Sequence, residues 1–101
     1  MKRCVIALKA SRDLNAISDY FVSRNIETGE RFLQDFDRKC VKLMQFPQMG
    51  RSYAAIRPLL RGVPLDGYII LYEAMDDEIT LLRVVNGRQN LDTLFDEEGE
   101  N

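Results

Sequence analysis

The chain has 101 residues, of which 46% are hydrophobic and 30% are charged, and its formal net charge is −2. This length and composition are typical of one soluble globular domain and exclude a disordered or fibrous protein. The chain has no histidine and only two cysteines, Cys4 and Cys40. It therefore lacks the commonest general base and the commonest zinc ligand, and a catalytic thiol would have no histidine partner. We expect no metal site and no cofactor.

No apolar stretch approaches the roughly 20 residues that a membrane-spanning helix requires. The apolar run from Val5 to Leu8 is also too short for the central region of a secretion signal. We therefore expect a cytoplasmic protein that does not bind membranes.

The charge is unevenly distributed along the chain. Residues 96–101 hold four of the acidic residues and no basic one, and this composition predicts a disordered tail after a single domain over residues 1–95. By contrast, residues 38–65 contain only basic charged residues, which are Arg38, Lys39, Lys42, Arg51, Arg57 and Arg61. These residues form either a solvated basic face or a surface for an acidic partner or nucleic acid.

The N-terminal residues predict a short strand followed by a helix. Residues 3–9 alternate weakly between apolar and polar side chains, which is typical of a strand. Ser11 is expected to cap the N-terminus of the helix, with Asp13 in the first turn, where a carboxylate suits the helix dipole. The alternation places three apolar side chains on one side of the strand: Cys4, Ile6 and Leu8.

Two consecutive helices are expected to form an antiparallel hairpin. The first carries an apolar stripe at helical spacing, and Asn25 ends it and starts the second. The second runs from about residue 26 to 46 and stops before Pro47, which a helix cannot pass. The apolar stripes are Leu14, Ile17 and Phe21 in the first helix, and Phe32, Phe36, Cys40 and Leu43 in the second.

Beyond Gly50 the apolar period changes from helical to two. Strands are expected over residues 57–63, 68–73 and 78–86, with turns at Asp66-Gly67 and at residues 75–77. The last strand is apolar on both faces, with Ile79, Leu81, Arg83 and Val85 on one of them. The helix hairpin covers one face of the sheet, and no other segment is expected to cover the second. An exposed apolar patch, typical of a protein interface, follows.

Five segments, in this order and spacing, resemble the ParE/RelE toxin superfamily of type II toxin–antitoxin systems, and its ParE branch in particular. They are Ala10-Ser11-Arg12-Asp13-Leu14 with Ile17 and Tyr20; Phe46-Pro47-Gln48-Met49-Gly50-Arg51; Leu60-Arg61; Tyr68-Ile69-Ile70-Leu71-Tyr72; and residues 79–88. The resemblance implies an α+β fold with an N-terminal strand and an antiparallel two-helix hairpin packed on one face of a twisted antiparallel sheet.

The resemblance also implies a toxin that inhibits DNA gyrase by protein binding and is neutralised by a cognate antitoxin, ParD-like or other. Two alternatives remain open: a RelE-like ribosome-dependent mRNA endonuclease, and an inactive antitoxin-binding module. Direct sequence-specific binding of nucleic acid by the toxin alone is not expected. One departure from the family pattern is Asn86, where many ParE-like chains carry a histidine.

The candidate site residues follow from these readings. Arg83 lies among apolar neighbours, so it either pairs with Glu73 across the hairpin or reaches an acidic partner from the open face. The expected target-binding residues are Arg57, Arg61, Arg83 and Arg88, and the expected antitoxin-binding residues are Ile79, Leu81 and Val85. No catalytic residue is expected unless the chain is a ribonuclease, for which the candidates are Arg61, Tyr72 and Arg83.

Overall fold

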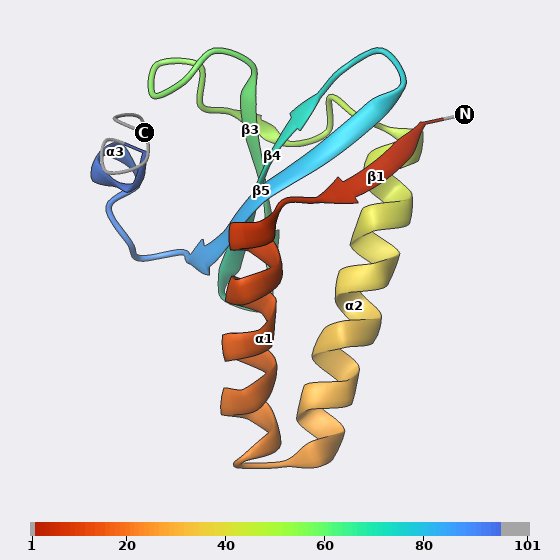
Figure 1. The fold of residues 1–101 in the computed structure, drawn as a ribbon, viewed down its shortest axis with the longest axis vertical. Helices are drawn as coiled ribbons and strands as arrows, with labels where there is room; N and C mark the ends of the chain where they lie inside the picture. Colours follow the sequence, from red (N-terminus) through yellow and green to blue (C-terminus); the bar gives the residue numbers. More distant parts are fainter. Residues whose placement is uncertain (1, 96–101) are drawn as a thin grey trace.

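The computed structural model describes residues 2–95 and contains a five-stranded sheet in the order β1-β5-β4-β3-β2. Its elements are β1 (Arg3–Ile6), α1 (Leu8–Val22), α2 (Ile26–Gln45), β2 (Arg51–Ser52), β3 (Leu60–Leu65), β4 (Tyr68–Ala74), β5 (Glu78–Asn86) and α3 (Leu91–Leu94). The long helices α1 and α2 run side by side, and α3 lies away from them (Figure 1). The predicted α+β fold is confirmed, with β1 joining β5 in parallel and the other strands pairing antiparallel.

Two further predictions concern the acidic tail and the absence of a membrane-spanning helix. The acidic tail at residues 96–101, predicted to be disordered, lies outside the described residues. Within residues 2–95, no helix combines the length and the apolar character needed to cross a bilayer.

The N-terminal strand is shorter than predicted, and the helix begins earlier. The N–H of Ala7 donates to the carbonyl of Leu81 at 2.9 Å, and the chain enters α1 directly at Leu8. Ala7 is the N-cap residue and makes no side-chain cap, so the prediction that Ser11 caps this helix is wrong. Asp13 accordingly lies beyond the first turn, and its carboxylate is available to another element.

The helix hairpin follows the local signals in the sequence. Asn25 caps α2 as predicted, because its Oδ1 accepts hydrogen bonds from the N–H groups of Glu27 at 2.9 Å and Thr28 at 3.3 Å. The helix ends at Gln45, two residues before Pro47. The predicted apolar face of α2 is buried against the sheet: Phe32, Phe36, Cys40 and Leu43.

The segment before β3 differs from the prediction. Strand β3 begins at Leu60 rather than at residue 57, because residues 53–57 form a turn in which Tyr53 accepts from the N–H of Ile56 at 2.9 Å. The short strand β2, which was not predicted, pairs with β3. The turn at Asp66-Gly67 is confirmed, and both residues have positive φ, as a tight hairpin turn requires.

A β-bulge in β5 reverses the predicted side-chain alternation. Leu71 pairs with Arg83, but the next residue, Tyr72, pairs with Leu81, so Leu82 is an extra residue in β5. An extra residue shifts the alternation by one position. Val84 therefore joins Leu81 on the helix side of the sheet, and Val85 lies on the opposite side.

Both faces of the sheet are covered. The main core lies between the sheet and the helices. On the opposite face, the C-terminal residues Leu94 and Phe95 pack on the sheet, flanked by residues of the 53–56 loop. The expectation that nothing in the chain covers this face is wrong. The second core contains Leu60, Leu71, Val85, Leu94 and Phe95.

Candidate functional site

The side chain of Arg83 is held by Asp13 of α1. The Nε of Arg83 donates to Asp13 Oδ2 at 2.7 Å and its NH2 donates to Oδ1 at 3.1 Å, a bidentate arrangement. Both side chains are about four-fifths buried, with relative exposures of 20% and 17%. The alternative in which Arg83 pairs with Glu73 is wrong, and Arg83 is already engaged inside the molecule.

The same carboxylate also accepts a hydrogen bond from the backbone of β5, beyond the end of its pairing with β1. Strand β1 ends at Ile6, opposite Leu81, so it offers no acceptor to the N–H groups of β5 further along. Asp13 Oδ2 accepts a hydrogen bond from the N–H of Val84 at 2.9 Å. It takes the role that a backbone carbonyl of β1 would have if that strand continued. In addition to the apolar packing between α1 and β5, Asp13 therefore links the two elements by hydrogen bonds, although local sequence rules assign this carboxylate to the helix dipole.

Arg57 forms a more exposed ion pair. Its Nε lies 3.1 Å from Glu73 Oε2, and its guanidinium lies 5.4 Å from the ring centroid of Phe95. The Arg57 side chain remains 42% exposed. Glu73, by contrast, is only 16% exposed, so the pair is exposed on the arginine side alone and releasing Arg57 would leave a largely buried carboxylate without this partner.

Arg61 and Tyr72 together fix the loop after α2. Arg61 NH1 donates to the carbonyl oxygens of Gly50 at 2.7 Å and Gln48 at 3.3 Å. The hydroxyl of Tyr72 donates to the carbonyl of Pro47 at 2.8 Å and accepts the N–H of Gly50 at 3.0 Å. Burial raises the pKa of the Tyr72 phenol. These contacts make both residues part of the scaffold.

Gly50 is required for this arrangement. A Cβ at that position would lie 2.6 Å from the Tyr72 hydroxyl oxygen and 2.9 Å from the carbonyl oxygen of Gly62, closer than real Cβ atoms approach. The glycine thus permits the close approach of the loop to β3 and β4.

Replacing Tyr72 with phenylalanine is expected to destabilise the fold by about 1–3 kcal/mol, because the Gly50 N–H loses its acceptor in a buried site. The toxic activity that the sequence resemblance implies is expected to persist. Denaturant unfolding together with growth assays checks both expectations, and Tyr20→Phe, at an exposed tyrosine, is the matched control. Loss of toxicity with unchanged stability would instead make the Tyr72 hydroxyl a functional group.

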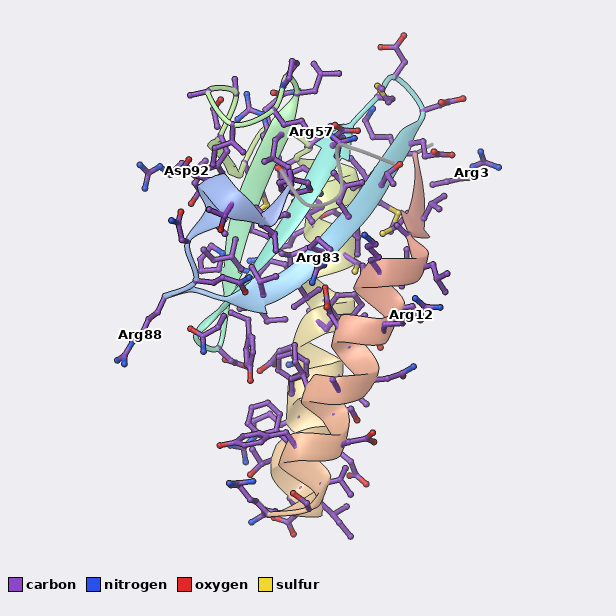
Figure 2. All side chains as sticks on the ribbon, turned by 60° about the vertical axis from the view of Figure 1, so that its left-hand side comes forward. Arg3, Arg12, Arg57, Arg83, Arg88 and Asp92 are labelled. Atoms are coloured by element: carbon purple, nitrogen blue, oxygen red, sulfur yellow. The ribbon has the colours of Figure 1, made fainter. Side chains whose placement is uncertain are left out.

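Arg88 lies on the surface after β5. Its N–H donates to Asn86 Oδ1 at 2.9 Å, so the residue that replaces the family's histidine stabilises the local turn. Among the described residues, Arg88 has no ion pair. The side chains of Arg57, Arg83 and Arg88 lie at separate places and do not converge on one point (Figure 2).

The three expected antitoxin-binding residues lie in the interior. Ile79 and Leu81 are 0% exposed in the core beneath the helices, and Val85 is 5% exposed beneath the C-terminal segment. The prediction that they share one open face is wrong, because the β-bulge places Val85 on the other side of the sheet. None of the three presents a surface that a partner contacts without opening the fold.

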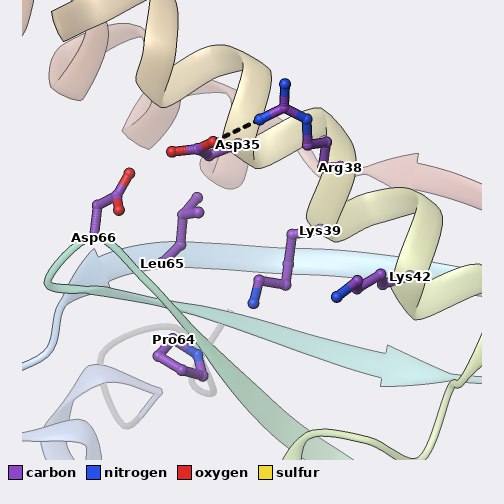
Figure 3. Close-up of a pocket in the computed structure, with 7 residues that line it drawn as sticks. All are labelled: Asp35, Arg38, Lys39, Lys42, Pro64, Leu65 and Asp66. Atoms are coloured by element: carbon purple, nitrogen blue, oxygen red, sulfur yellow. Dashed lines mark hydrogen bonds and ion pairs between the residues drawn. The ribbon is translucent and has the colours of Figure 1, made fainter.

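A pocket of about 310 Å³ lies between α2 and the β3–β4 turn. Lys39 and Lys42 extend from α2 toward the strand, while Arg38 donates to Asp35 at 3.1 Å (Figure 3). Burial and the neighbouring carboxyl group of Asp35 raise the pKa of Asp66 on the other side of the pocket. The pocket contains none of the predicted site residues.

The basic stretch over residues 38–65 therefore does not form one surface. Its first three basic residues line the pocket beside α2, whereas Arg57 pairs with Glu73 and Arg61 binds the loop carbonyls. Within residues 2–95, no group of three or more histidine, cysteine, aspartate or glutamate side chains is placed to hold a metal ion.

Comparison with known proteins gives a consistent result. The family model for the ParE toxin of the parDE type II toxin–antitoxin system matches residues 5–91. Toxin ParE3 of Caulobacter vibrioides is 26% identical over 92 residues, which span 90% of this chain and 92% of that protein. A solved structure of the chromosomal ParDE system from P. aeruginosa superposes with a TM-score of 0.71 at 25% identity, covering 85% of this chain and 96% of that one.

Proposed function

This chain belongs to the ParE toxin family of type II toxin–antitoxin systems, and from that premise we propose that it inhibits DNA gyrase by binding to it and is neutralised by a cognate antitoxin. We place this action in the cytoplasm, where gyrase and the antitoxin are found. The protein needs no cofactor for it.

One observation carries the choice of protein binding over RNA cleavage. The three side chains suited to a ribonuclease site are each engaged in the scaffold: Arg61 holds loop carbonyls, Tyr72 is buried with its hydroxyl bonded twice, and Arg83 is paired with Asp13. A general acid or base must reach the reacting atoms. Because Tyr72 is 0% exposed, its hydroxyl does not reach a bound substrate.

The surface available to the target includes two of the predicted arginines. Arg88 is exposed and has no ion pair among the described residues, and the Arg57 side chain is 42% exposed beside the largely buried Glu73. Arg88 is therefore able to bind an acidic group on gyrase without breaking an ion pair, whereas Arg57 would share its exposed side between Glu73 and the target. Arg61 and Arg83 are expected to act on the target only indirectly, by maintaining the fold.

Expression of the chain without its antitoxin tests this proposal. We expect growth arrest accompanied by gyrase-linked DNA breaks, with cellular mRNA intact. Unchanged growth would identify an inactive antitoxin-binding module, and cleavage of ribosome-bound mRNA would identify a ribonuclease. Either result contradicts gyrase inhibition.

For the antitoxin we propose the outer edge of β1 as a contact. Strand β1 ends the sheet, and its alternate residues bond to β5, so the backbone groups of Cys4 and Ile6 face outward. The adjacent side chains are apolar and exposed, at 38% for Val5, 43% for Ile6 and 65% for Leu8. An uncovered strand edge with apolar side chains promotes aggregation, and a bound segment of the antitoxin would remove that hazard.

Ile6→Lys is expected to weaken antitoxin binding at least tenfold, because a charged side chain enters the apolar contact. The thermal midpoint of the free toxin is expected to change little, since Ile6 is exposed. Calorimetric titration with the antitoxin measures the affinity. Met75→Lys, at an exposed apolar residue on the β4–β5 turn, is the matched control. Equal affinities for both variants would exclude the β1 edge as the contact.

A further inference from the structure

The only two cysteines in the chain lie together in the fold. Cys4 belongs to β1 and Cys40 to α2, far apart in the sequence, and neither is in a disulfide. Cys40 is buried in the main core, Cys4 packs against the same core, and the two thiols are hydrogen-bonded to each other. The packing of β1 and α2 on one core thus brings the two thiols together.

The two sulfur atoms differ in environment. The hydrogen bond from Cys40 lowers the pKa of the Cys4 thiol, and Cys4 is only partly buried. The same hydrogen bond, together with burial, raises the pKa of the Cys40 thiol. Since the thiolate is the reactive form, Cys4 is the thiol that an oxidant attacks, and Cys40 supplies the second sulfur from within the core.

We propose that Cys4 and Cys40 form a reversible oxidation site, in which a hydroperoxide converts the two thiols into a disulfide that ties β1 to α2. The sulfur of Cys4 attacks the peroxide and becomes a sulfenic acid, and water or an alcohol leaves. The sulfur of Cys40 then attacks the sulfenic sulfur, and a second water leaves with the thiol proton. The two thiols lose two electrons and two protons, and the peroxide is reduced by the same two electrons.

The disulfide would constrain a large part of the chain. It closes a loop that contains all of α1 and most of α2, and a cross-link of this size restricts the unfolded state. Because both cysteines already lie where β1 and α2 pack on the main core, we expect the disulfide to form with little rearrangement of these elements. We expect the thermal midpoint to rise on the order of 10 °C on oxidation.

The full-length protein, reduced and then treated with hydrogen peroxide, tests the site. Intact-mass spectrometry under denaturing conditions should find a monomer lighter by two hydrogen atoms, with no titratable thiol, and dithiothreitol should restore the original mass and midpoint. Cys4→Ser and Cys40→Ser proteins should not form the intramolecular product. Because the measurement on the unsubstituted chain is decisive, it does not depend on the folding of either variant.

Three results would overturn the inference. One is separate oxidation of the thiols to sulfinic or sulfonic acids, a second is formation of intermolecular dimers alone, and the third is a disulfide that leaves the thermal midpoint unchanged. The first two exclude the thiol pair, and the last excludes its constraint on the fold.

Discussion

Replacing Asp13 with alanine is expected to destabilise this protein by about 2–4 kcal/mol, more than the loss of the carboxylate from any other described ion pair. The variant removes the two carboxylate oxygens that accept from the Arg83 guanidinium, one of which also accepts the N–H of Val84. These groups are largely buried, so water does not fully replace the carboxylate. The thermal midpoint should fall on the order of 10–20 °C.

The matched control for Asp13→Ala is Glu73→Ala. Glu73 is the carboxylate that the sequence offered as one possible partner of Arg83, yet in the structure it pairs with the partly exposed Arg57. Its loss should cost less than about 1 kcal/mol. Asp13→Asn, which keeps one acceptor oxygen but not the charge, should fall between the two. Equal losses for the Asp13 and Glu73 variants, measured by urea unfolding, would contradict the assigned pairing.

Replacing both Leu94 and Phe95 with alanine is expected to cost on the order of 5 kcal/mol. These two side chains cover Leu60, Leu71 and Val85 on the sheet face that the helices leave open. A loss of this size is comparable with the total stability of many domains, so the variant should populate partly unfolded, aggregating forms. Size-exclusion chromatography and binding of a dye specific for exposed apolar surface measure the outcome.

Thr93→Ala provides the control for the C-terminal segment. Thr93 lies in the same helix but is exposed, and its hydroxyl donates only to the carbonyl of Asn90 at 3.2 Å. It should behave like the unsubstituted protein. If the double variant also remains monomeric and binds no dye, the C-terminal segment does not act as the cover of the sheet.

Where local rules determine an element, the sequence predicted it well. The cap at Asn25, the stop before Pro47 and the turn at Asp66-Gly67 each depend on residues a few positions apart, and all three were found. The C-terminal cover was missed because α3 has only four residues, too few to show an amphipathic period. No packing role was therefore predicted for Leu94 and Phe95.

The site residues were harder to predict, because long-range contacts determine them. The partner of Arg83 is Asp13, on an element that sequence proximity does not connect to β5. The bulge at Leu82 likewise follows from pairing with β4, and no residue within β5 marks it. As a result, Val85 lies on the opposite side of the sheet from Ile79 and Leu81, and these two residues, expected at an interface, lie in the core. The exposed position of Arg88 was easier to predict, because it depends only on the surface turn after β5.

Purified components test most directly whether the chain acts by binding gyrase. The purified toxin is added to gyrase supercoiling plasmid DNA, and separately to ribosomes translating an mRNA, each with and without the antitoxin. We predict inhibited supercoiling with accumulation of cleaved plasmid, reversal by antitoxin, and intact mRNA. The Tyr72→Phe protein should inhibit equally well. Unimpaired supercoiling together with antitoxin-sensitive cleavage of the ribosome-bound mRNA would contradict the proposal.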